Sequence, residues 1–570
     1  MLPIPVLSGK ASPIAALLLA AIVASAPAQA GDGSGEPIPC EGLPELQLGD
    51  TTISTARFTG GSFTPPGTTT TLTDLPAFCR VVGSIRPTTD SDIQFEVWMP
   101  ISGWNKKFLS AGEGGFAGAI NHAGIADALR RGYAGGSTDT GHVGGTADFA
   151  PGHPEKVIDF GWRAHHLQAA RSKKIISAFY GERIRHSYFS SCSNGGRQAL
   201  MELQRFPEDF DGVIVGAPAH DWTHLFAGFV WNEQALWNTP GAYLTASNLA
   251  AVQAATLATC DALDGVVDGV VEDPRRCRFD PASLACPAGT QSNSCLTPPQ
   301  VEAVRKIMQG PRKAHTSHMS HVKHDNGAGG QLFPGYFTSA AGEPGSWSAW
   351  ITGPAVPGAS IQAFFGNAFF GRVINEIPAP GVWDFSTFDF GEDMRAADRK
   401  AEHTFNATDP DLRSFRRQNP KGKIIMWHGW EDPAISALSS IDYYQQVVRQ
   451  NHDARDFFRL FLAPGMLHCG GGPGPNSFGQ SLPQARPLSN APEHDILSAL
   501  ERWVEKGAAP ERIVAVKYIG NQPAQGIERT RPLCPYLNVA VYKGSGSTQD
   551  EANFECRHPS RDKDGHGLDD

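Results

Sequence analysis

Three residues have the types that nucleophilic acyl transfer requires: Ser193, Asp432 and His468. A serine hydroxyl attacks a carbonyl when a base removes its proton, and an imidazole oriented by a carboxylate is a common base. Each residue follows shortly after a predicted strand, and their order along the chain is the one that α/β-hydrolases use. We therefore predict Ser193 as the nucleophile, His468 as the general base and acid, and Asp432 as the carboxylate that orients the imidazole.

Two other carboxylates compete with Asp432 for the acid role. Glu431 directly precedes it, and Asp139 also follows a predicted strand but comes before the serine. Taken alone, each of the three predicted catalytic residues also fits a structural turn or a solvated loop. Their shared order and their positions at strand ends favour catalysis over those readings.

The stretch around Ser193 reads as a short strand, a sharp turn and a helix. Small residues flank the serine of a nucleophile elbow because the strand must turn tightly into the helix. Gly195 follows the usual G-x-S-x-G pattern, whereas Ser191 stands in place of its first glycine. This is a mild departure from the pattern.

A glycine-rich loop at 111–118 follows another predicted strand. It lacks the Lys-Ser/Thr that would make it a phosphate-binding loop. In an α/β-hydrolase this position supplies the first donor of the oxyanion hole, and the residue after the nucleophile supplies the second. We therefore predict that the backbone N–H groups of Gly115 and Asn194 form the oxyanion hole.

Predicted strands and helices alternate up to about residue 218 and again from residue 411. This rhythm indicates the α/β class, a mostly parallel sheet flanked by helices in an α/β-hydrolase fold. Between them the chain is irregular and aromatic, which is typical of a lid. The predicted divisions are a signal peptide (1–30), the first part of the core (31–219), the lid (220–410), the second part of the core (411–557) and a disordered tail (558–570).

The N-terminus has the pattern of a secretory signal. Lys10 precedes an apolar run at 13–24, and Ala28-Gln29-Ala30 is a small-residue cleavage site. We expect cleavage after Ala30 and a secreted or periplasmic protein; the alternative is an uncleaved anchor. The formal net charge of −10 indicates binding neither to nucleic acid nor to an anionic membrane, and no obligate protein partner is predicted.

The ten cysteines are an even number, which in an exported chain indicates disulfides. Spacing makes three close pairs plausible, and a fourth would tie down the new N-terminus: Cys260–Cys277, Cys286–Cys295, Cys534–Cys556 and Cys40–Cys79. The two remaining cysteines, Cys192 and Cys469, are direct neighbours of the predicted nucleophile and base. If that serine and histidine are in contact, these cysteines come within disulfide reach. The alternative is that Cys192 is unpaired and acts as a nucleophile itself.

The combination of Cys192-Ser193, Asp432 and His468-Cys469 resembles the Cys-Ser, Asp and His-Cys signature of the tannase/feruloyl esterase family. The resemblance covers nearly the whole mature chain, including the loop at Gly115 and the segments 216–218, 529–535 and 542–546. It implies a secreted acyl-esterase with an α/β-hydrolase fold, a large lid and five disulfides paired as above.

A second cluster of oxygen donors lies in the predicted lid. Calcium prefers six to eight hard oxygen ligands from carboxylates and backbone carbonyls. The segment 260–270 offers three carboxylates between glycines, but it lacks the spacing of an EF-hand. Spacing alone leaves an acidic turn equally plausible. The family resemblance implies a structural Ca²⁺ held by the side chains or carbonyls of Asp261, Asp264, Val266, Asp268 and Val270.

We expect a serine carboxylesterase acting on small-molecule or plant-polymer esters of hydroxylated aromatic acids, feruloyl esters first and galloyl esters (tannase activity) second. Terephthalate monoester hydrolysis is less favoured. The relatives with that activity are thought to clamp the free carboxylate with a lid arginine, and the segment 357–362 has none, although Arg372 lies nearby. A non-catalytic calcium-binding module, the hypothesis from another class, requires a broken triad or missing donor glycines, and the sequence has neither.

Two further patterns in the lid have a functional and a structural interpretation. Histidines recur every third residue at His315, His318, His321 and His324, which fits either a transition-metal site or a solvated loop. Six lid aromatics fit lid core, while one or two of them could stack on an aromatic acyl group: Trp347, Trp350, Phe364, Phe365, Phe369 and Phe370.

Overall fold

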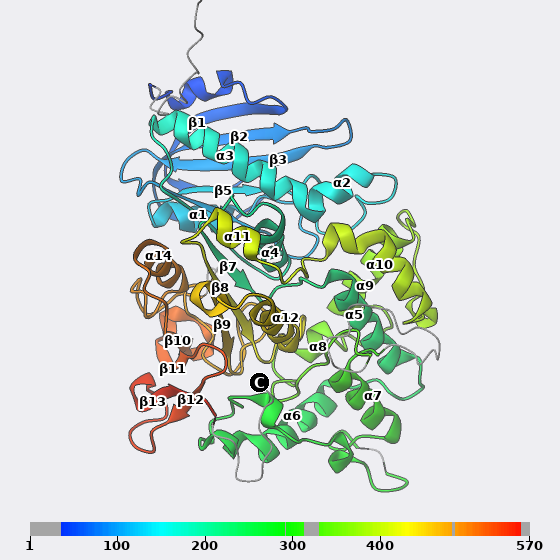
Figure 1. Ribbon diagram of the computed structural model, residues 1–570. Helices are drawn as coiled ribbons and strands as arrows, with labels where there is room; N and C mark the ends of the chain where they lie inside the picture. Colours follow the sequence, from blue (N-terminus) through cyan, green and yellow to red (C-terminus); the bar gives the residue numbers. More distant parts are fainter. Residues whose placement is uncertain (1–35, 291, 313–329, 481–484, 560–570) are drawn as a thin grey trace, which may run out of the picture.

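The computed structural model describes residues 36–290, 292–312, 330–480 and 485–559 (Figure 1). The predicted signal peptide, the histidine run at 315–324 and nearly all of the predicted tail lie outside these residues. Within them, no helix combines the length and apolar character needed to cross a membrane.

A nine-stranded sheet forms the centre of the molecule, with strand order β1-β2-β3-β5-β4-β6-β7-β8-β9. The first three strands pair antiparallel with one another, and β3 pairs antiparallel with β5. From β5 to β9 all neighbours are parallel. The strands are β1 (Thr51–Phe63), β2 (Leu72–Ile85), β3 (Ile93–Pro100), β4 (Lys107–Ala111), β5 (Ala134–Thr138), β6 (His186–Cys192), β7 (Gly212–Gly216), β8 (Lys423–Gly429) and β9 (Phe458–Ala463).

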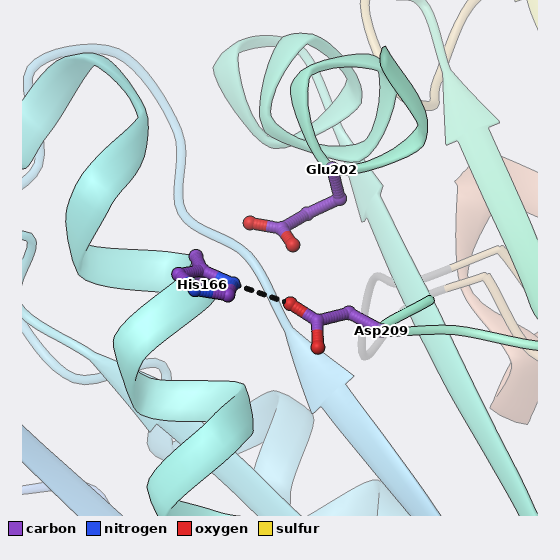
Figure 2. Close-up of side chains that lie close together, drawn as sticks. All are labelled: His166, Glu202 and Asp209. Carbon is purple, nitrogen blue, oxygen red and sulfur yellow. Dashed lines mark hydrogen bonds and ion pairs between the residues drawn. The ribbon is translucent and has the colours of Figure 1, made fainter. Parts of the chain in front are cut away.

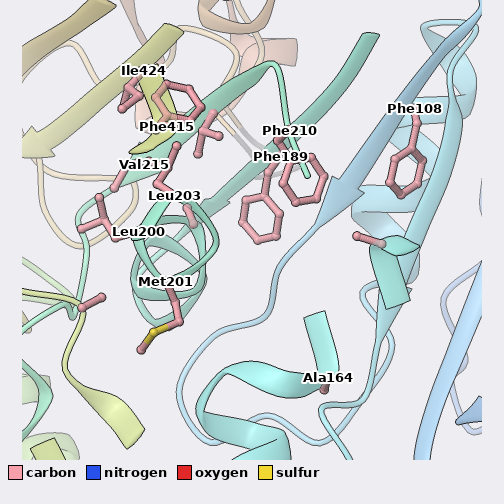
Figure 3. Close-up of a cluster of buried hydrophobic side chains, with 14 of the residues drawn as sticks. Phe108, Ala164, Phe189, Leu200, Met201, Leu203, Phe210, Val215, Phe415 and Ile424 are labelled. Carbon is pink, nitrogen blue, oxygen red and sulfur yellow. The ribbon is translucent and has the colours of Figure 1, made fainter. Parts of the chain in front are cut away.

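Helices cover both faces of the parallel strands, so these strands are buried on both sides and nearly continuously apolar. Successive side chains point to opposite faces. Val213 and Val215 pack in a cluster with α3 (Ala164–Tyr180), α4 (Asn194–Arg205) and α12 (Ala437–Gln450); Figure 3 shows part of this cluster. Ile214 packs on the other face with α1 (His122–Arg130) and α14 (Ile496–Lys506).

The long helical segment before β6 is not uniform. It consists of α2 (Pro154–Ile158), a π-helical turn (Asp159–Arg163) and α3. Single π turns in helices frequently occur at functional sites. Here the carbonyls of Phe160 and Gly161 in this turn accept hydrogen bonds from Arg197 on the helix that follows the nucleophile.

The segment between β7 and β8 is more regular than the sequence indicates. The sequence indicates an irregular lid here, whereas long helices lie near both ends of the segment. α5 carries apolar side chains on every face and is buried along most of its length, so it lacks the periodicity that identifies a surface helix. The helices are α5 (Trp222–Trp237), α6 (Ala246–Cys260), α7 (Pro298–Gln309), α8 (Trp347–Trp350), α9 (Ile361–Ala368), α10 (Glu392–Phe405) and α11 (Arg413–Gln418).

Two small antiparallel sheets, which the sequence did not predict, follow α13 (Ala454–Phe457), β9 and α14. β10 (Ile513–Tyr518) pairs with β11 (Ile527–Leu533), and β12 (Val539–Tyr542) pairs with β13 (Phe554–Arg557). Val266 of the lid packs with Ala540 and Phe554 of the second sheet. The second small sheet therefore contacts the loop in which calcium is predicted (Figure 1).

Five disulfides cross-link the fold. They join the pairs that the sequence predicts: Cys40–Cys79, Cys192–Cys469, Cys260–Cys277, Cys286–Cys295 and Cys534–Cys556. No cysteine is free.

Candidate active site

Ser193 occupies the turn between β6 and α4 with φ 67° and ψ −124°. This left-handed backbone is strained for a residue with a side chain, and such strain is typical of a nucleophile elbow. Two close approaches explain the glycines that follow. A Cβ on Gly195 would lie 1.9 Å from Oγ of Ser191, and one on Gly196 would lie 2.3 Å from the carbonyl oxygen of Gly216. The serine that replaces the usual first glycine is therefore accommodated by Gly195.

Ser193, His468 and Asp432 form one chain of hydrogen bonds. Nε2 of His468 lies 3.0 Å from Oγ of Ser193, and its Nδ1 lies 2.8 Å from Oδ2 of Asp432. The ends of β6, β8 and β9 bring the three residues together, because carboxyl ends of neighbouring parallel strands meet at one edge of the sheet. The geometry matches the arrangement in which an imidazole can take a proton from the serine.

Asp432 is fully buried yet held in its ionised form. Burial acts to raise the pKa of its carboxyl, but the neighbouring imidazoles of His468 and His428 hold the pKa well below its usual range. Oδ1 also accepts hydrogen bonds from the backbone N–H groups of Ala434 and Ile435, at 2.8 and 2.9 Å. A permanent negative charge next to Nδ1 of His468 stabilises the imidazolium that forms when the serine loses its proton.

The two competing carboxylates lie elsewhere. Glu431 accepts hydrogen bonds from the Ser339 hydroxyl and the Ala340 N–H, and burial raises its pKa to about 7. Asp139 accepts from the N–H groups of Gln94 and Gly141, at 2.9 Å each, and burial raises its pKa to about 7 as well. Neither has a hydrogen bond to His468, so Asp432 is the carboxylate of this site.

His428 is a residue of the site that the sequence analysis missed. Its Nε2 lies 2.9 Å from the carbonyl oxygen of Ile435 and 3.2 Å from Oδ2 of Asp432, and its Nδ1 lies 2.7 Å from Oγ of Ser440. Two acceptors at Nε2 place the proton on that nitrogen. His428 therefore contacts the same oxygen of Asp432 as His468 does, and it helps to orient that carboxylate. The only sequence signal was its position at the end of a strand, four residues before the aspartate.

Gly115 and Asn194, the two predicted oxyanion donors, line the same pocket as Ser193. The side chain of Asn194 accepts from Nε of Arg197 at 2.8 Å. Arg197 is fully buried between aromatic rings, which fixes the first turn of α4 and so the direction of the Asn194 N–H.

A pocket of about 270 Å³ opens above the serine. Of the six lid aromatics, Trp350 and Phe365 line it; the Trp350 ring lies edge-on to that of His468 at 5.0 Å. Trp347, Phe369 and Phe370 are buried in lid clusters, and Phe364 is 45% exposed. Most of the other apolar side chains come from the unpredicted helix α5 and from the loop after β8: Trp222, Leu225, Phe226, Phe229, Ala434 and Ile435.

The described lining of this pocket contains no aspartate, glutamate, lysine or arginine. Arg372, the arginine that lies near the segment 357–362 in the sequence, forms an ion pair with Asp148 at 2.7 Å. Its guanidinium also donates hydrogen bonds to two backbone carbonyls. Ser360 caps α9 and donates to Glu233 at 2.6 Å. Neither residue lines the pocket, so neither can bind a substrate carboxylate there without rearrangement.

Cys192 and Cys469 lie with their Cα atoms 6.1 Å apart and are bonded. Cys469 has φ 59°, a second left-handed residue directly after the histidine. The bond therefore connects the two strained turns that carry Ser193 and His468. It closes a loop of 277 residues that includes the whole lid.

The predicted calcium positions lie in one loop between α6 and the small sheets. Asp261 accepts from the N–H groups of Asp268 and Gly269. Burial and the nearby carboxylates raise the pKa of Asp264 to about 6. Arg529 and Arg531 pair with Asp268. Asp261 is buried, and Asp264 and Asp268 are partly buried. Their carboxylates and the neighbouring backbone carbonyls are the hard-oxygen donors that Ca²⁺ prefers, so the residue types fit the ion.

The fold and the site together define the class of protein: a carboxylic ester hydrolase of the α/β-hydrolase type. The sequence model described as "Tannase and feruloyl esterase" matches residues 79–557. The chain belongs to this tannase and feruloyl esterase family.

Individual proteins similar to this chain also carry the names of esterases or ester hydrolases. An "uncharacterized esterase" of Xanthomonas campestris pv. campestris is 43% identical over 541 residues, 91% of each chain. The "mono(2-hydroxyethyl) terephthalate hydrolase" of Piscinibacter sakaiensis is 33% identical over 85% of each chain. The solved structure of "feruloyl esterase B from Aspergillus oryzae" superposes with a TM-score of 0.81 at 28% identity, covering 91% of this chain and 99% of that one.

We predict that removing the bond next to Ser193 impairs catalysis in a protein that is still folded. The Cys192→Ala/Cys469→Ala variant should lose at least about tenfold in kcat/KM at 25 °C, because both strained turns lose their connection. Its melting temperature should also fall further than that of the matched variant Cys286→Ala/Cys295→Ala. That control opens a loop of only 9 residues, far from the serine. An unchanged kcat/KM in the folded first variant would contradict the positioning role.

Proposed function

We propose that this protein hydrolyses esters of hydroxylated aromatic acids through an acyl-enzyme on Ser193. The observation that carries the proposal is the hydrogen-bonded chain Ser193–His468–Asp432 at the floor of an aromatic pocket. A serine next to an imidazole at 3.0 Å can attack an ester, and an apolar pocket with flat side chains favours an aromatic acyl group.

The groups at the site have defined roles in this reaction. Nε2 of His468 removes the proton from Oγ of Ser193 as Oγ bonds to the ester carbon, and the carbonyl oxygen becomes an oxyanion. The N–H groups of Gly115 and Asn194 donate to that oxyanion, which in other hydrolases stabilises the transition state by roughly 3 kcal/mol per donor. The imidazolium then gives its proton to the leaving alcohol. A water molecule, activated by the same imidazole, releases the acid and restores Ser193.

The pocket favours a neutral acyl group over one that carries a free carboxylate. Burying a carboxylate without a cationic or hydrogen-bonding partner is costly, and the described lining offers neither lysine nor arginine. Feruloyl and galloyl groups carry phenolic hydroxyls instead, and the edges of Trp350 and Phe365 suit such rings. Feruloyl esters are the first candidate and galloyl esters the second; terephthalate monoesters are expected to be poor substrates.

The same proposal includes a structural calcium ion and export from the cytoplasm. The ion would be bound by the side chains of Asp261, Asp264 and Asp268 and by the carbonyls of Val266 and Val270. It would stabilise the contact between the lid and the small sheets. Bound there, calcium supplies charge compensation and no chemistry on the ester. Five disulfides support an oxidising compartment, because such bonds are rare in reducing ones.

The substrate class is tested by comparing methyl ferulate, methyl gallate and monomethyl terephthalate as substrates of the mature protein. We expect kcat/KM to be highest for ferulate and lowest for the terephthalate monoester. Ser193→Ala should lower kcat by at least about 10³-fold on every ester cleaved. Ser187→Ala, at the other end of β6, is the matched control and should retain activity. Efficient terephthalate monoester turnover would overturn the assigned acyl preference, and an active Ser193→Ala would overturn the mechanism.

The calcium assignment is tested by chelation. Removing Ca²⁺ with EGTA should lower the melting temperature by several degrees, because an ion that binds only the folded protein stabilises it. Adding Ca²⁺ should restore the melting temperature, and Mg²⁺ should not, since it demands a smaller octahedral site. Asp264→Ala should melt like the chelated protein and ignore calcium, whereas Asp280→Ala, an exposed lid aspartate, should respond like wild type. Equal melting with and without EGTA would argue against the site.

A further inference from the structure

A second group of metal-ligand side chains lies away from the Ser193 pocket. His166 comes from α3, Glu202 from α4, and Asp209 from the loop between α4 and β7. Ligand atoms of the three residues all lie within 4.8 Å of one another. Figure 2 shows the imidazole and both carboxyl groups pointing toward a common point between the two helices. The ester hydrolysis described above uses none of them.

Glu202 is the unusual member of this group. It is 1% exposed, and its Oε2 has no hydrogen-bond partner among the described residues. Burial, and then the negative charge of Asp209, raise the pKa of Glu202 well above its usual range. A buried carboxyl with an unpartnered oxygen costs free energy of folding unless something else binds it. Its direction, toward His166 and Asp209, indicates where that missing partner belongs.

The other two residues are already oriented toward the same point. The His166 ring stacks on Phe206, with centroids 3.7 Å apart and planes within 11°. This packing directs Nδ1 to Oδ2 of Asp209 at 2.7 Å. Lys173 contacts the other carboxylate oxygen, Oδ1, at 3.3 Å, so Oδ2 is left to face the imidazole and Glu202. The His166 side chain is 26% exposed, which gives an ion a route from solvent.

We propose that His166, Glu202 and Asp209 bind a divalent transition-metal ion of the Zn²⁺ class. One imidazole nitrogen and two carboxylate oxygens are ligands that Zn²⁺ accepts, with water in the fourth position. Mg²⁺ and Ca²⁺ are disfavoured because they prefer oxygen ligands throughout. The two carboxylates would balance the charge of the ion.

The position of the cluster makes the ion structural. Glu202 lies nine residues after Ser193 in the same helix, which corresponds to about 13 Å along the helix axis. An ion at this point would join α3 to α4 and to the turn before β7, so it would fix the far end of the helix that begins at the nucleophile. It would stabilise the fold without contacting the ester.

The experiment measures Co²⁺ and Zn²⁺ binding to the full-length mature chain after chelation and addition of excess Ca²⁺. The background carries serine at the four histidines His315, His318, His321 and His324, which removes a competing metal ligand set. We expect one ion per chain, a visible Co²⁺ ligand-field spectrum that Zn²⁺ abolishes, and a rise in melting temperature with Zn²⁺. Loss of an outer-shell partner of a metal ligand weakens metal binding roughly 10–100-fold. His166→Gln and Glu202→Gln each remove a ligand, so each should weaken binding by more than that.

Two comparisons separate this site from adventitious binding and from unfolding. His186→Gln removes a histidine near Asp211 at 4.0 Å, a surface pair without a third ligand, and should leave the affinity unchanged. Glu202→Gln keeps the side-chain shape and removes the buried carboxyl, so the metal-free variant should fold and retain esterase activity. Absence of Co²⁺ binding, or equal binding by wild type and both ligand variants, would overturn the proposal whatever the ester specificity turns out to be.

Discussion

The structure depends on the turn at Ser193, where β6 ends and α4 begins. The backbone there is left-handed, and it is held by the hydrogen bond from the Ser193 N–H to Gly216 at 2.9 Å. The turn is possible because Gly195 and Gly196 allow the helix to approach Ser191 and β7 more closely than any side chain would permit. The same turn sets the direction of the serine hydroxyl and of the N–H of Asn194.

The adjacent carboxyl groups of Glu431 and Asp432 have opposite pKa shifts because their surroundings differ. Asp432 and Glu431 are both buried, so both would favour their neutral forms if burial acted alone. Two imidazoles and two backbone N–H groups surround Asp432 and keep it ionised, whereas Glu431 has a hydroxyl and one N–H from the lid and a raised pKa. Neighbouring carboxyls with opposite pKa shifts are a common way of separating an ionised catalytic group from a structural one.

The sequence predicted those features that depend on local pattern. Strand periodicity and the order of Ser193, Asp432 and His468 gave the fold class and the residues that meet at the sheet edge. The neighbouring cysteines gave the bond between Cys192 and Cys469. The structure adds α5, whose apolar residues lie on every face and so give no helical period. It also adds the small sheets after α14, whose strands are short.

Contacts that no motif announces could not be predicted from the sequence. His428 approaches Asp432, four residues on, only because the chain turns sharply at the end of β8. Glu202 meets His166 only because α3 and α4 pack side by side on one face of the sheet. The six lid aromatics illustrate the same limit, because composition alone predicts only that one or two of them contact the substrate. In the structure, Trp350 and Phe365 line the pocket, and three others are buried in the lid.

The central claim is that the acyl group passes through a covalent bond to Ser193. The most direct measurement is mass spectrometry of the mature protein after reaction with an activated organophosphate, which phosphorylates a serine only where a neighbouring base activates it. We expect one adduct per chain, on the peptide that contains Ser193, with loss of esterase activity in proportion to labelling; Asp432→Asn should slow the reaction. A fully labelled protein that carries its adduct on another residue, or that retains its esterase activity, would contradict the account.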